Sequence, residues 1–132
     1  MQETTFKPGD RTFFASDSLT PPYSAAFEDD GQTGYFYALD LTRSDNMILD
    51  AVHIYNVANV SDRERLSSLS IVWSADGMKC ALLINDYPHA AFDFVARRGC
   101  SRTNFPNSPN TPAACWGDSD HHWSDEAIAW LK

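Results

Sequence analysis

The chain contains little cysteine, little glycine and few basic residues, and each shortage excludes a class of function. Its three cysteines, Cys80, Cys100 and Cys115, are odd in number and form no Cys-x-x-Cys motif. Neither a fully paired disulfide framework nor a structural zinc site is therefore indicated. No glycine run matches a phosphate loop or a dinucleotide fingerprint, and no serine lies in Gly-x-Ser-x-Gly. The sequence thus lacks the complete motifs of kinases, Rossmann enzymes and serine hydrolases.

Long apolar segments are also missing. No stretch approaches the length that a bilayer-spanning helix needs, and the first ten residues lack the basic and apolar parts of a signal peptide. We therefore expect a cytoplasmic protein that has no membrane partner.

Basic residues are outnumbered, with 10 Lys and Arg against 18 Asp and Glu, so the formal charge is −8. Such a charge repels nucleic acid and anionic lipid, and it favours a protein partner with a basic surface. The alternative interpretation is that the charge keeps a small protein soluble. The 132 residues, of which 43% are hydrophobic, predict a single domain over residues 1–132.

Alternating aromatic and β-branched residues predict antiparallel strands. One hairpin is expected over residues 24–41 and a second over residues 69–84, each with a glycine in its turn. A strand is expected within residues 47–57, and another over residues 89–95 joins the second hairpin to make a meander.

The last third of the chain changes character. Pro106, Pro109 and Pro112 predict a long irregular loop before residue 123. Residues 124–132 then begin with a capping serine followed by two acids, which predicts a short helix that docks through Ile128 and Leu131. The predicted fold class is therefore α+β: mostly antiparallel sheet built from hairpins and a meander, a long Pro-rich loop and a short C-terminal helix.

Three adjacent acids, Glu28, Asp29 and Asp30, enter the first predicted turn. Acids at such positions commonly stabilise the turn itself in contact with water. The alternative is that they bind Lys or Arg side chains of a partner.

The Pro-rich region supplies the other candidates. Trp116 is a large aromatic outside regular structure, so it either packs under the loop or inserts into a partner. Asp118, Asp120, His121 and His122 carry groups that ligate metals or act as general bases, but their spacing matches no specific motif. An exposed polar segment is the simpler interpretation.

The chain resembles an uncharacterised family of small bacterial proteins. The resemblance covers most of residues 20–106 and rests on Glu-Asp-Asp-Gly-Gln-Thr-Gly-Tyr-Phe-Tyr-Ala at residues 28–38, Asp-Ala-Val-His-Ile-Tyr-Asn-Val at residues 50–57 and Ser-Ala-Asp-Gly at residues 74–77. The family implies no catalytic residues. In size and charge its members look like immunity proteins that neutralise bacterial toxins, including those of type VI secretion.

These observations lead to one hypothesis and two alternatives. We expect an immunity or inhibitor protein without catalytic residues, metal or cofactor, which occludes the active site of a toxin. The expected contacts combine acidic turns with an aromatic side chain: Glu28, Asp29, Asp30, Trp116, Asp118 and Asp120. The alternatives are a small metal- or ligand-binding enzyme that uses residues 118–122, and a structural subunit of an oligomer that pairs through exposed strand edges.

Overall fold

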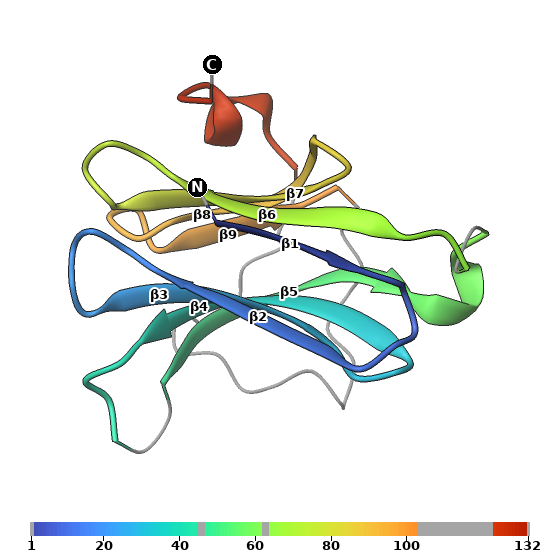
Figure 1. The fold of residues 1–132 in the computed structure, drawn as a ribbon. Coiled ribbons are helices and arrows are strands. Elements are labelled where there is room, and N and C mark those ends of the chain that lie inside the picture. Colours follow the sequence, from blue (N-terminus) through green and yellow to red (C-terminus); the bar gives the residue numbers. More distant parts are fainter. Residues whose placement is uncertain (1, 45–46, 62–63, 103–122, 132) are drawn as a thin grey trace.

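The computed structural model describes residues 2–44, 47–61, 64–102 and 123–131, which form two antiparallel sheets packed face to face (Figure 1). The five-stranded sheet has the order β1 (Gln2–Phe6), β6 (Ser67–Trp73), β7 (Lys79–Ile84), β8 (Tyr87–Asp93) and β9 (Arg98–Ser101). The four-stranded sheet has the order β2 (Thr12–Asp17), β3 (Tyr23–Asp29), β4 (Thr33–Asp40) and β5 (Ile48–Asn56). A 3₁₀ turn, η1 (Val57–Asn59), follows β5.

Both predicted hairpins are confirmed. Strands β3 and β4 pair around a turn in which Gly31 has a φ of 97°, and β6 and β7 pair around a turn in which Gly77 has a φ of 72°. Glycine adopts this left-handed region without the steric penalty that a Cβ atom imposes. Strand β8 pairs with β7, so the predicted meander is also present.

The two sheets enclose one apolar core. Phe36 of the four-stranded sheet stacks on Phe92 of the five-stranded sheet with ring centroids 4.9 Å apart. Phe27, Val52 and Leu82 are fully buried in the same cluster. Alternate residues along each strand point into this core, which is the pattern of sheets packed with aligned strands.

The predicted α+β class is wrong, because the described residues form a β-sandwich and the segment near the C-terminus contains a single turn of 3₁₀ helix. That turn, η2 (Asp125–Ile128), begins at the predicted cap, where the Ser124 hydroxyl accepts a hydrogen bond from the Glu126 N–H. The expected segment is shorter than the roughly 12–15 residues that an isolated helix needs, so local propensity does not extend it. Ile128 and Leu131 nevertheless pack on Ala81, Ala91 and Cys100, as predicted.

Arg102 contacts both the five-stranded sheet and the segment near the C-terminus. Its guanidinium carbon lies 4.4 Å from the ring centroid of Tyr87 and 4.0 Å from that of Trp123. Cation–π contacts of this kind stabilise by roughly 0.5–2 kcal/mol. The segment thus lies over the outer face of that sheet (Figure 1).

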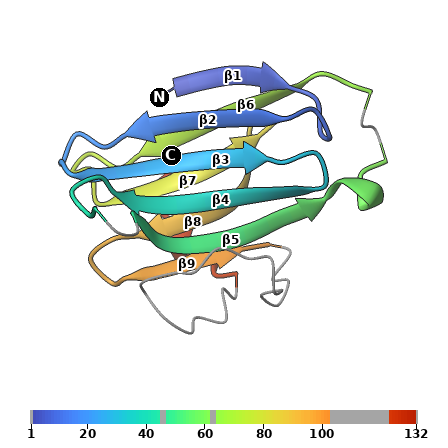
Figure 2. The ribbon, with the colours of Figure 1, turned by 90° about the horizontal axis from the view of Figure 1, so that it is seen from below.

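The two long sides of the sandwich differ. On one side β5 and β9 lie next to each other, and the Ser101 hydroxyl of β9 donates a hydrogen bond of 2.8 Å to the carbonyl oxygen of His53 in β5. On the other side β1 and β2 are the outermost strands of their sheets (Figure 2). Within the described part of the chain, no helix has the length and apolar character to span a membrane.

Candidate functional site

The acidic turn predicted from the sequence is held together by Asp29. This side chain is only 1% exposed, and its carboxylate accepts hydrogen bonds from the Gly9 N–H at 2.7 Å, the Gly31 N–H at 2.8 Å and the Tyr55 hydroxyl at 2.6 Å. These donors come from three separate parts of the chain. Asp29 therefore joins the β1–β2 loop, the β3–β4 turn and strand β5.

The two neighbouring acids are more accessible. Asp30 is exposed and accepts hydrogen bonds from the N–H groups of Gln32 and Thr33, both at 2.9 Å. Glu28 is half-buried and accepts a hydrogen bond of 2.7 Å from the Tyr37 hydroxyl. Burial, together with the bond to Glu28, raises the pKa of Tyr37 above its usual range, so this tyrosine stays a donor at neutral pH.

Beside these acids, strand β2 presents an aromatic side chain to solvent. Phe13 is 65% exposed and lies directly opposite Glu28 in the pairing of β2 with β3. Its neighbour Phe14 packs against the core, so Phe13 points away from the sandwich. Ala15 and Asp17 share the exposed face of β2, and the exposed Asp10 precedes the strand. We call Asp10, Phe13, Ala15, Asp17, Glu28 and Asp30 the β2 surface.

Phe13 did not figure in the sequence-based prediction. Residues 12–17 do not alternate polar and apolar side chains, because Phe13, Phe14 and Ala15 are consecutive, so the sequence does not say which ring faces the core. The distinction depends on the pairing of β2 with β3, which places Phe14 opposite the buried Phe27.

The remaining predicted site residues, Trp116, Asp118 and Asp120, lie outside the described residues, as do His121 and His122. Among the residues that the structure describes, no group of three or more His, Cys, Asp or Glu side chains is placed to hold a metal ion. The contacts that Trp116, Asp118 and Asp120 are expected to make with a partner therefore remain predictions.

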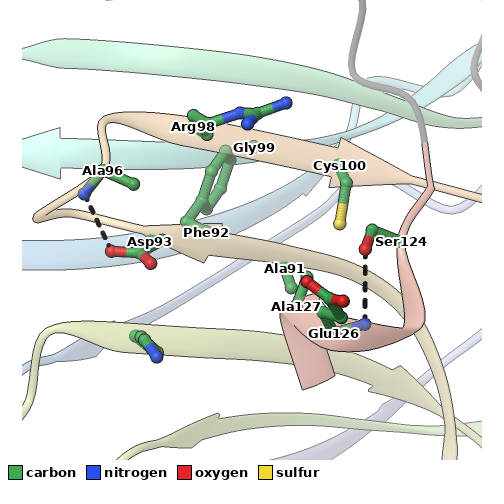
Figure 3. A pocket seen from close by; sticks show the side chains of 11 residues that line it. Ala91, Phe92, Asp93, Ala96, Arg98, Gly99, Cys100, Ser124, Glu126 and Ala127 are labelled. Carbon is green, nitrogen blue, oxygen red and sulfur yellow. Dashed lines mark hydrogen bonds between the residues drawn. The ribbon is translucent and has the colours of Figure 1, made fainter. Parts of the chain in front are cut away.

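A hollow of about 340 Å³ lies on the outer face of the five-stranded sheet beside η2 (Figure 3). Its lining includes four charged side chains and one thiol: Lys79, Asp93, Arg98, Glu126 and Cys100. Cations and carboxylates thus line the same hollow.

Two of these groups have structural roles. The Asp93 carboxylate accepts hydrogen bonds from the N–H groups of Val95 and Ala96, both at 3.0 Å. Figure 3 shows the bond from Ala96. Burial raises the pKa of the Cys100 thiol, so the nucleophilic thiolate is disfavoured. Asp93 therefore stabilises the turn between β8 and β9, and Cys100 is an ordinary buried thiol.

A second hollow, of about 420 Å³, opens between the two sheets at the end formed by the β1–β2 loop and the start of β6. Its walls include Phe6, Ile54 and Ile84, and Arg65 and His89 also line it. The lining is mainly apolar with a few polar groups, which is the usual character of a small-molecule pocket.

Comparison with known proteins places the chain in a family. A model of the family described as "Uncharacterized protein conserved in bacteria (DUF2251)" matches residues 6–132. An uncharacterized protein of Haemophilus influenzae is 44% identical over 84 residues, which are 64% of this chain and 52% of that relative. The chain thus spans about half the length of this relative, and no solved structure matches it. Because the family model covers nearly the whole chain, this protein belongs to the DUF2251 family of conserved bacterial proteins.

Proposed function

We propose that this protein acts by binding another protein through the β2 surface. The observation that carries the proposal is the exposure of Phe13, 65%, on an outermost strand among acidic side chains. Large aromatic side chains are enriched among the residues that dominate binding energy. The aromatic contact expected from the sequence was Trp116, which lies outside the described residues, so Phe13 is a different aromatic side chain.

The charge around Phe13 defines the chemistry of the partner. Asp10, Asp17 and Asp30 are exposed, and Glu28 lies directly across from Phe13. Residues 10–17 and 28–30 contain five acidic side chains and one basic side chain, Arg11, so the local charge is negative. A partner with an apolar pocket ringed by Lys or Arg fits this surface best, because opposite charges speed association and select the partner.

Strand β2 also offers backbone groups. It is the outermost strand of its sheet in the described part of the chain, and residues 12–16 contain neither proline nor a charged side chain. Proteins commonly block exposed strand edges with Lys or Pro to prevent pairing. The partner segment is therefore expected to be extended and to add a strand beside β2.

The more specific form of the proposal names a bacterial toxin as the partner. It is supported by the small size of the chain and by its charge of −8, because immunity proteins are similar in both properties. Occlusion of a basic active site requires a rigid scaffold that presents acidic groups, and a β-sandwich provides such a scaffold.

The test is an affinity pull-down from the source bacterium with tagged protein, followed by mass spectrometry. Phe13→Ser and the triple variant Asp10→Lys, Asp17→Lys, Asp30→Lys change the β2 surface, and Val95→Ser, at a position 70% exposed in the β8–β9 turn, is the matched control. Removing a central aromatic contact costs roughly 2 kcal/mol or more, so we expect at least about tenfold weaker binding.

Circular dichroism first checks that each variant is folded. A partner that is retained equally by the wild type and both β2 variants would contradict the assignment of the surface. A partner that proves not to be a toxin would contradict the more specific form alone.

A further inference from the structure

The hollow between the two sheets has the walls of a small-molecule site. Phe6 and Ile54 are part of the buried core, and Val60 and Ile84 continue the apolar lining toward solvent. Its volume of about 420 Å³ lies within the range of small-molecule pockets, roughly 300–1,000 Å³. An aliphatic or aromatic body would therefore leave water on entering it.

In the described part of the lining, the side chain that carries a charge is Arg65. Arg65 lines the hollow, whereas no Asp or Glu is among the described lining residues. The hollow beside η2 differs, because Asp93 and Glu126 accompany its cations. A guanidinium group beside an apolar cavity favours a ligand with one negative charge.

Two further groups provide hydrogen bonds without adding charge. Burial, and secondarily the positive charge of Arg102, lower the pKa of His89, so its imidazole is neutral at pH 7. The Ser67 hydroxyl accepts a bond of 3.4 Å from the Asn85 amide, which leaves its own O–H to donate. A carboxylate accepts bonds from such donors as well as from Arg65.

We propose that this hollow binds a small amphipathic acid, a molecule with one carboxylate on an aliphatic or aromatic body. The carboxylate pairs with Arg65 at the rim, and the apolar body lies between Ile54 and Ile84. This site is independent of the β2 surface, because Phe13 faces outward from the four-stranded sheet whereas the hollow lies between the sheets.

Calorimetric titration of the full chain with octanoate, octanol and acetate tests both parts of the proposed ligand. Octanoate is expected to bind saturably, at least about tenfold more tightly than octanol, which lacks the charge, and than acetate, which lacks the apolar body. Octanol binding as tightly as octanoate would overturn the role of Arg65, and acetate binding as tightly would show an adventitious ion only.

Variants then locate the site. Arg65→Gln is expected to weaken octanoate about tenfold while leaving octanol unchanged, whereas Arg97→Gln, an equal loss of charge in the β8–β9 turn, leaves both unchanged. Since Arg65 is exposed, its replacement should not prevent folding. Methyl resonances of Ile54 and Ile84 should shift on titration of the wild type. Absence of octanoate binding, or equal effects of the two arginine variants, would overturn the proposal.

Discussion

Replacement of Asp29 by asparagine should destabilise the protein strongly although the two side chains have the same shape. The carboxylate accepts three hydrogen bonds, from the N–H groups of Gly9 and Gly31 and from the Tyr55 hydroxyl. An amide has one acceptor oxygen, so in every orientation its NH₂ group faces at least one of these donors. The introduced amide loses fewer bonds when its oxygen takes the place of the carboxylate oxygen that binds Gly9 and Tyr55. Its NH₂ group then faces the Gly31 N–H, and that bond is lost.

The expected loss follows from the environment of the side chain. A hydrogen bond to a charged group contributes about 1.5–3 kcal/mol, and a donor left unsatisfied by burial adds a further cost of about 1–3 kcal/mol. Since Gly31 is half-buried, part of that second cost is relieved by water. We therefore expect Asp29→Asn to lower the free energy of unfolding by about 3 kcal/mol, and Tm by roughly 10 °C for a chain of this size.

Urea and thermal unfolding measure this loss, with Asp30→Asn as the control. Asp30 is exposed and caps its own turn, a role that asparagine also performs, so the control should change stability by less than about 0.5 kcal/mol. Equal effects of the two variants would refute the assignment of Asp29 as the structural acid. A double-mutant cycle that pairs Asp29→Ala with Tyr55→Phe should show coupling of about 1 kcal/mol or more, because Asp29→Ala removes the bond from Tyr55 that Asp29→Asn keeps.

Three further predictions concern the core, a turn and the tyrosines. Phe92→Ala should lower the free energy of unfolding by about 3–5 kcal/mol in urea titrations, because it empties the centre of the core. Gly77→Ala should cost more than Gly31→Ala in the same assay: both have positive φ, but at Gly77 the added Cβ would lie 2.5 Å from the Ser18 hydroxyl, whereas at Gly31 its nearest contact is 3.8 Å away. Burial raises the pKa of Tyr55 and Tyr37 above the ordinary 10.0, so the unfolded chain releases these protons first and stability falls as pH rises above about 10. Each tyrosine contributes at most about 1.4 kcal/mol per pH unit, reduced by solvent screening. Tyrosinate absorbance of the native protein near pH 10.5 that decreases in Tyr37→Phe or Tyr55→Phe would contradict this prediction.

The strands that were predicted are those that local sequence specifies. Hairpins β3–β4 and β6–β7 carry glycine turns between alternating runs, and Asn85 and Asp86 form the next turn with φ values of 51° and 66°. Strands β1, β2 and β9 were not predicted. β1 pairs with the distant β6, and β9 has four residues, so no short-range pattern marks either strand.

The candidate site was predictable to the same extent. Three acids at a turn are visible in the sequence, but the contacts of Asp29 with Gly9 and Tyr55 arise from tertiary packing. The exposure of Phe13 depends on strand register in the same way. Sequence patterns therefore indicated where an acidic surface lies, whereas the fold determines which of its side chains reach solvent.

The pairing of β1 with β6 has a consequence for how the chain folds. The four-stranded sheet comes from one continuous segment, residues 12–56, and strands β6 to β9 from another, residues 67–101. β1 precedes the first segment in the chain yet pairs with the second, with Gln2 opposite Ile71. During synthesis β1 must therefore stay unpaired until β6 has left the ribosome, and closure of this long loop should place folding among the slow β-rich proteins, on the order of milliseconds to seconds.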